Sequence, residues 1–143
     1  MAGCCIALGQ LEDSDMGWSG LCNGGGAVNV PATLTTVAQI VIQPGASKLF
    51  ADIYSADFRL TDFDIAVRSH RDSSAFTKVA DIASDYTTSI SWPLDGCSAD
   101  LTTLAKTTWA TVAMDVKRMH AVRMQANCNT ANDTDVLVYW SMR

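Results

Sequence analysis

The chain has 143 residues, of which 48% are hydrophobic and 17% are charged, and its net charge is −5. This length is typical of one domain, which buries roughly two thirds of its surface and folds without disulfides or a metal. The ten basic residues form no run longer than Lys117-Arg118, so the sequence lacks the basic patch that nucleic acids require, and an acidic chain suits an anionic membrane surface poorly.

The cysteines are predicted to be free thiols rather than members of a set of structural disulfides. There are five of them, an odd number, and none forms a C-x-x-C pair, so neither a set of disulfides nor a zinc site is predicted. The first residues lack the basic region and long apolar run of a signal peptide, and no stretch approaches the ~20 apolar residues of a membrane helix. We therefore expect synthesis in a reducing cytoplasm and no membrane partner. The adjacent Cys4 and Cys5 leave open a cross-link between subunits in an oxidising medium.

Residues 1–32 differ from the rest of the chain and predict an extended N-terminal arm. They hold most of the glycines, including the run 24–26, and neither a helical nor a strand period. A disordered tail would be more polar. The apolar residues of this segment are expected to seek a partner surface, and the predicted interface residues are Leu8, Leu11, Trp18 and Leu21. The alternative is an irregular segment folded back on its own domain.

Alternating apolar and polar residues predict a series of strands beyond the arm. Those before residue 70 lie at 34–42, 48–54 and 58–69. The first ends at Pro44-Gly45, a turn sequence. Residues 76–82 fit a short strand or a helical turn, and residues 101–105 fit one helical turn that crosses between sheets.

The last third of the chain shows the strongest alternation. It predicts three strands, at 109–116, 119–126 and 135–142, each with one buried and one wetter side. We expect them to pair in succession as a meander. A tight two-residue turn at Lys117-Arg118 is disfavoured because it would require Asn or Gly at positive φ, so this connection should be longer or open.

These segments together predict an all-β fold. About seven or eight strands, with turn signals about every 8 to 12 residues, are typical of an antiparallel β-sandwich or jelly roll, here over residues 33–143. Helical periodicity is weak, and the abundant threonines suit strands.

No pattern in the chain indicates a reaction. His70 and His120 could pair with Ser69 or a cysteine, but no nucleophile elbow is present, and we expect a solvated turn residue and a packed residue instead. Asp62-x-Asp64 and residues 129–135 are rich in oxygen ligands for Ca²⁺, yet the second segment lacks the spacing of an EF-hand and reads as an ordinary strand connection. We therefore predict no catalytic, cofactor-binding or metal-binding residue.

The aromatic residues allow a second reading. A row of Trp and Tyr on one sheet face can stack on sugar rings, but neighbours such as Tyr139 and Trp140 point to opposite faces of their strand, so only one of them can belong to such a platform. The tryptophans at 18, 92, 109 and 140 are spread along the chain rather than clustered. Core packing is expected for most of them.

A resemblance to a known group of proteins rests on four segments. These are Asp85-Tyr86-Thr87 and the residues at 101–105, 113–127 and 133–140. They resemble small β-sandwich virion proteins of tailed bacteriophages, which serve as head decoration or cement proteins and as other minor structural components. The likeness covers residues 58–142 and leaves out the arm; the cysteines and methionine-rich strands are not part of it.

The resemblance implies a non-enzymatic structural protein that binds and stabilises a phage capsid shell. Such a subunit would form homo-oligomers, as dimer or trimer, and would reside in the virion after assembly in the host cytoplasm. No nucleic acid, membrane or cofactor is expected as partner. The alternatives are a carbohydrate- or receptor-binding β-sandwich module of a tail fibre or spike and, from a third class, a hydrolase built on cysteine or histidine.

Overall fold

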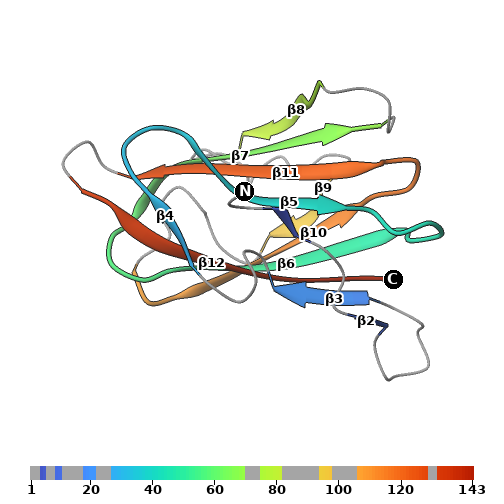
Figure 1. The fold of residues 1–143 in the computed structure, drawn as a ribbon, viewed down its shortest axis with the longest axis horizontal. Helices are drawn as coiled ribbons and strands as arrows, with labels where there is room; N and C mark the ends of the chain where they lie inside the picture. Colours follow the sequence, from blue (N-terminus) through green and yellow to red (C-terminus); the bar gives the residue numbers. More distant parts are fainter. Residues whose placement is uncertain are drawn as a thin grey trace.

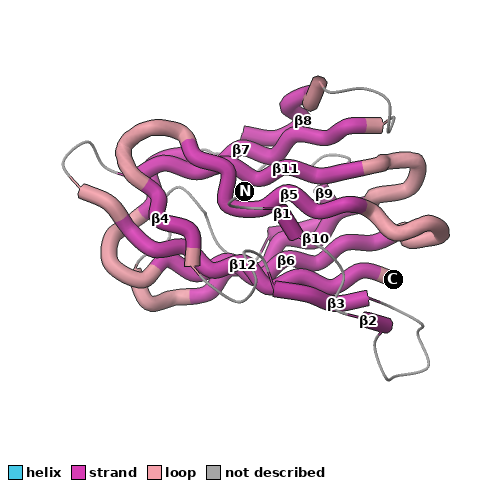
Figure 2. The backbone as a smooth tube through the Cα atoms, in the orientation of Figure 1, coloured by secondary structure: helices cyan, strands magenta, loops and turns pink. Residues whose placement is uncertain are grey.

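The computed structural model describes residues 4–5, 9–10, 18–21, 27–69, 75–81, 94–97, 106–128 and 132–143; for 4–5, 9–10, 18–21, 80–81 and 95–97 it describes the backbone alone. Within these residues all regular structure is β-strand, as Figure 2 shows. The strands form two sheets that enclose one core, which confirms the predicted all-β sandwich. The described part of the chain contains no helix long and apolar enough to cross a membrane.

Sheet A has five strands in the order β1-β5-β11-β7-β8. Their bounds are β1 Cys4–Cys5, β5 Thr35–Val41, β7 Leu60–Arg68, β8 Thr77–Asp81 and β11 Ala121–Cys128. The pairs are antiparallel except for β1, which runs parallel to β5. In Figure 1, β7, β11 and β5 lie side by side across the upper half of the molecule.

Sheet B has seven strands, six of them in the order β2-β3-β12-β6-β10-β9, and β4 also pairs with β12. Their bounds are β2 Gly9–Gln10, β3 Trp18–Leu21, β4 Val28–Val30, β6 Lys48–Ser55, β9 Leu94–Cys97, β10 Trp109–Asp115 and β12 Thr134–Met142. All of its pairs are antiparallel, and β6, β12 and β3 cross the lower half of Figure 1.

The core lies between the inner faces of the two sheets, and strand alternation determines which residues enter it. As predicted, β12 has one buried and one wetter face, and its buried residues are Val136, Val138, Trp140 and Met142. In β10 and the residue after it the buried residues are Ala110, Val112, Met114 and Val116. In β5 the alternation breaks, because Val37 has no partner between Ala38, opposite Met124, and Thr36, opposite Gln125. This bulge turns Val37 and Ala38 both into buried positions.

The prediction of a meander over the last third is wrong. β10 and β12 belong to sheet B, β11 belongs to sheet A, and no two of the three strands pair with each other. Alternation shows only that each of the three strands has one apolar face, and the opposite sheet buries that face whether the strands share one sheet or are divided between two. The connection at 116–120 therefore passes from one sheet to the other, which agrees with the expected open turn.

The N-terminal segment contributes backbone to both sheets. β1 pairs with β5, and β3 pairs with the second half of β12, from Tyr139 to Met142. Val28 and Val30 of β4 lie within the range predicted as an arm, yet they are buried in the core, so the packed domain includes residues before 33. An arm function for residues 1–26 stays a prediction.

Candidate functional site

Three aromatic side chains meet on the outer face of sheet B. Tyr54 belongs to β6, Trp109 to β10 and Tyr139 to β12, three strands that lie next to one another. Each alternates with a core residue, because Ile53, Ala110 and Trp140 point inward. The register places Trp109 directly opposite Tyr54, whereas Tyr139 lies one row further along β6, opposite Asp52. We call these three rings the aromatic face.

The rings touch one another and remain open to solvent. The ring centroids of Tyr54 and Trp109 are 4.9 Å apart, and those of Trp109 and Tyr139 are 5.3 Å apart. Such contacts stabilise a pair by about 0.5–1.5 kcal/mol, which holds the side chains in place. Nevertheless, Trp109 is 48% exposed and Tyr139 is 42% exposed. Large aromatic side chains that stay half exposed on a pre-ordered surface are suited to contact with a partner.

Polar groups border the aromatic face. The Thr111 hydroxyl donates a hydrogen bond of 2.6 Å to the Asp52 carboxylate, in the row that also contains Tyr139. The Arg143 guanidinium lies 5.2 Å from the ring centroid of Phe50, two residues along β6 from Asp52. A shallow hollow of about 120 Å³ lies among these groups, and its lining is Phe50, Asp52, Tyr139, Trp140 and Ser141. Because it is small and shallow, it suits a single small group of a partner.

Although the four tryptophans are spread along the chain, aromatic side chains do gather on this surface. Trp109 clusters with two tyrosines that are distant in sequence, because sheet pairing brings β6, β10 and β12 together. The inference that only one of Tyr139 and Trp140 can join a platform is confirmed, since Trp140 is buried. Alternation could have placed each ring on an outer face, but nothing local in the sequence shows which strands are neighbours.

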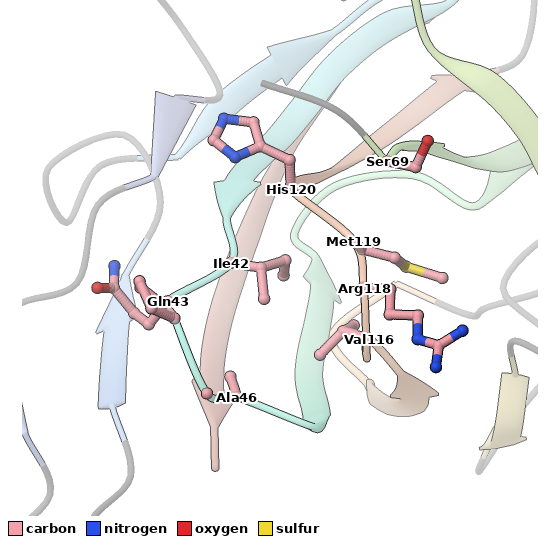
Figure 3. A pocket seen from close by; sticks show the side chains of 10 residues that line it. Ile42, Gln43, Ala46, Ser69, Val116, Arg118, Met119 and His120 are labelled. Carbon is pink, nitrogen blue, oxygen red and sulfur yellow. The ribbon is translucent and has the colours of Figure 1, made fainter. Parts of the chain in front are cut away.

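A second, larger hollow lies where β5, β10 and β11 meet their loops. It measures about 490 Å³ and is lined by Ile42, Gln43, Pro44, Gly45, Ala46, Ser69, Val116, Arg118, Met119 and His120. Figure 3 shows the His120 imidazole and the Arg118 guanidinium extending in different directions, with the Ser69 hydroxyl turned away from both. Among the described residues, no hydrogen bond joins Ser69 to His120. Geometry therefore gives no reason to assign a nucleophile and base here.

The remaining predicted positions are placed as follows. Leu8, Leu11, His70 and Trp92 lie outside the described residues, whereas Trp18 and Leu21 are the first and last residues of β3. Asp64 is on the outer face of sheet A, where its carboxylate is 3.1 Å from the Lys78 ammonium. Over the described ranges, no three His, Cys, Asp or Glu side chains come close enough together to hold a metal ion.

Neither a protein-family model, nor a curated protein, nor a solved structure matches this chain.

Proposed function

We propose that the protein is a non-enzymatic structural subunit that binds other protein chains through the aromatic face. The observation that supports this is the contact of Tyr54, Trp109 and Tyr139 on three adjacent strands while two of the rings remain nearly half exposed. Tryptophan and tyrosine are the residues most enriched at the energetic centres of protein interfaces.

The surroundings of the rings fit an interface of this kind. Interfaces have apolar anchors at the centre and a polar rim that excludes water. Asp52 and Thr111 bind each other beside the rings, so neither is left without a hydrogen-bond partner when a partner chain covers them. The small hollow next to Tyr139 would take one side chain of that partner.

The assembly we propose is a phage virion, in which the protein would bind and stabilise the capsid shell as a homo-oligomer. This step rests on the resemblance of residues 58–142 to small virion proteins and on the low charge content of 17%, which suits a surface covered by other chains. A standard contact buries ~1,600 Å² in total, more than the aromatic face alone supplies. The N-terminal segment, with Leu8, Leu11, Trp18 and Leu21, is the proposed source of additional contact area.

Replacing Trp109 tests the proposal. We expect Trp109→Ala to weaken self-association, measured by sedimentation velocity over a concentration series, by tenfold or more, because removal of an interface anchor costs ≥ 2 kcal/mol. Phe58→Ala is the matched control: Phe58 is 42% exposed but lies in the turn between β6 and β7. A wild-type chain that is monomeric at every soluble concentration and absent from purified virions would contradict the proposal.

A carbohydrate-binding module is the second candidate. The observation in its favour is the position of the Asp52–Thr111 pair beside exposed rings, which resembles the mix of stacking and polar groups in sugar sites. Against it, the ring planes are tilted by 36° and 46° and form no single flat platform. Saturable binding of one glycan by a monomeric protein, lost in Trp109→Ala and kept in Phe58→Ala, would establish this function instead.

A further inference from the structure

The outer face of sheet A gathers basic side chains around one aromatic ring, although the chain as a whole has a net charge of −5. The guanidinium carbon of Arg68 in β7 lies 5.1 Å from the ring centroid of Phe76. That of Arg123 in β11 lies 4.7 Å from the same centroid. Lys78, two residues after Phe76, is on the neighbouring strand β8.

Strand register explains why the two arginines converge on this ring. Arg68 pairs with Ala121, and Arg123 pairs with Ala66, so arginine and alanine alternate across β7 and β11. The small alanines leave space above the sheet for the long side chains, and both alanines are themselves buried. Contact with Phe76 restricts the two flexible side chains and holds both guanidinium groups near the same ring.

The basic side chains on the outer face of sheet A differ in whether a carboxylate neutralises them. The Lys78 ammonium lies 3.1 Å from the largely buried carboxylate of Asp64, which balances that pair. Within the described residues, no carboxylate forms an ion pair with Arg68 or Arg123, and the buried Nε of each has no hydrogen-bond acceptor. Two like charges held near the same ring repel each other, and an anion bound to both partly exposed side chains would relieve this repulsion.

We propose that Arg68 and Arg123 form a binding site for a doubly charged oxyanion of the phosphate or sulfate class. Two guanidinium groups supply two positive charges, which match such a dianion, and their planar forks suit its oxygens. A carboxylate would neutralise only one of the two charges. Because Phe76 already holds the side chains, little ordering is required on binding. The site lies on the opposite sheet from the aromatic face and is independent of the function proposed above.

The test is a titration of the ¹⁵N-labelled full chain at low ionic strength, followed through the arginine Nε–Hε signals and the amides of Ala66 and Ala121. Inorganic phosphate and sulfate should each cause saturable shifts, and acetate at the same ionic strength should bind about tenfold more weakly. Glycerol phosphate distinguishes a site for free inorganic phosphate from a site for a phosphate group on a larger ligand, since it binds only in the second case.

Variants assign the effect to the two arginines. Arg68→Gln and Arg123→Gln should each weaken phosphate binding about tenfold, the loss expected for one charge-assisted hydrogen bond. Arg123→Lys keeps the positive charge but lacks the planar guanidinium group, so its affinity for phosphate should lie between those of the wild type and Arg123→Gln. This variant keeps the proposal testable if Arg123→Gln does not fold. Arg143→Gln is the matched control, because it removes a guanidinium stacked on Phe50 on the other sheet. The proposal fails if phosphate gives no saturable shift, if acetate binds as well, or if Arg143→Gln has the same effect as Arg68→Gln.

Discussion

At the scale of single residues, a pair of buried hydroxyls joins the turn after β6 to the start of β12. The Ser55 hydroxyl donates to the carbonyl of Phe58 at 2.6 Å, so the Thr134 hydroxyl must donate to Ser55, 2.9 Å away. The same Thr134 oxygen accepts the backbone N–H groups of Asp57 at 2.9 Å and Phe58 at 3.1 Å. Ser55 and Thr134 are fully buried, so their hydroxyl groups need partners within the protein, and this network supplies them.

Thr134→Val should therefore destabilise the fold despite its nearly identical shape. Valine leaves the N–H groups of Asp57 and Phe58 without an acceptor, at about 1–3 kcal/mol each, so the free energy of unfolding should fall by roughly 2–4 kcal/mol. Thr134→Ser keeps the oxygen, loses one methyl group, and should cost about 1 kcal/mol. Urea unfolding measures both; equal losses would mean that the methyl group, and not the oxygen, matters.

At the scale of elements, two connections between strands contain a strained backbone conformation. Thr107 and Arg118 both adopt positive φ, at 61° and 65°, where side chains with a Cβ are disfavoured. Arg118 lies in the connection between β10 and β11, which is fixed by hydrogen bonds from Val116 N–H to Ser47 C=O and from His120 N–H to Arg68 C=O. Arg118 adopts positive φ although the connection is not a tight hairpin turn, because the hydrogen bonds at its two ends fix its path.

Glycine at either strained position should stabilise the protein. Thr107→Gly and Arg118→Gly are each expected to raise the free energy of unfolding by up to about 1 kcal/mol, because the relief of strain exceeds the entropy that glycine gains in the unfolded chain. Lys117→Gly is the control, since Lys117 is exposed in the same turn and is not at positive φ, so only the entropic loss remains. Thermal unfolding followed by calorimetry distinguishes these outcomes; a lower melting temperature for Arg118→Gly would show that its side chain matters more than its φ.

The edge of β12 gives a second prediction at this scale. β3 covers Tyr139 to Met142 and β4 covers Thr134 to Val136. Deleting residues 1–26 removes β1, β2 and β3 but keeps β4, so the truncated chain should fold while the second half of β12 becomes an open edge. Hydrogen exchange should then accelerate at Tyr139–Met142 and stay unchanged at Thr134–Val136. A truncated chain that does not fold would show that the segment belongs to the core.

At the scale of the whole molecule, the chain alternates between the sheets. The strands β5, β6 and β7 lie in sheets A, B and A, and β10, β11 and β12 lie in sheets B, A and B. The backbone hydrogen bonds of these strands therefore join segments far apart in sequence, which is the pattern of a slow-folding topology. One core results, closed by both sheets together.

Far-ultraviolet circular dichroism should show a spectrum dominated by strand. The reason is that every regular element in the described ranges is a strand. Sedimentation of the same sample provides the control that the signal comes from folded protein rather than from aggregated strands. A helical fraction above about a third, the globular average, would contradict the two-sheet architecture.

The class of the fold and the division of each strand into two faces follow from the amino-acid pattern alone. Alternation is a local property, so it places Val136, Val138, Trp140 and Met142 on one face and Tyr139 on the other whatever the partner strands are, and the first face is the buried one. The same pattern predicted strand at 48–54, and β6 covers that range.

Which strands are neighbours depends on the packing of the whole chain. An alternating pattern gives each strand one apolar face, and the opposite sheet buries that face whether the three strands share a sheet or not, so the pattern did not show that the three strands of the predicted meander lie in two sheets. Both the aromatic face and the proposed anion site depend on which strands are neighbours. Tyr54, Trp109 and Tyr139 meet because β6 lies between β10 and β12, and Arg68 and Arg123 share Phe76 because β7 lies between β11 and β8. The physical reason is that burial acts on the whole chain at once, whereas a periodic pattern reports only on its own segment.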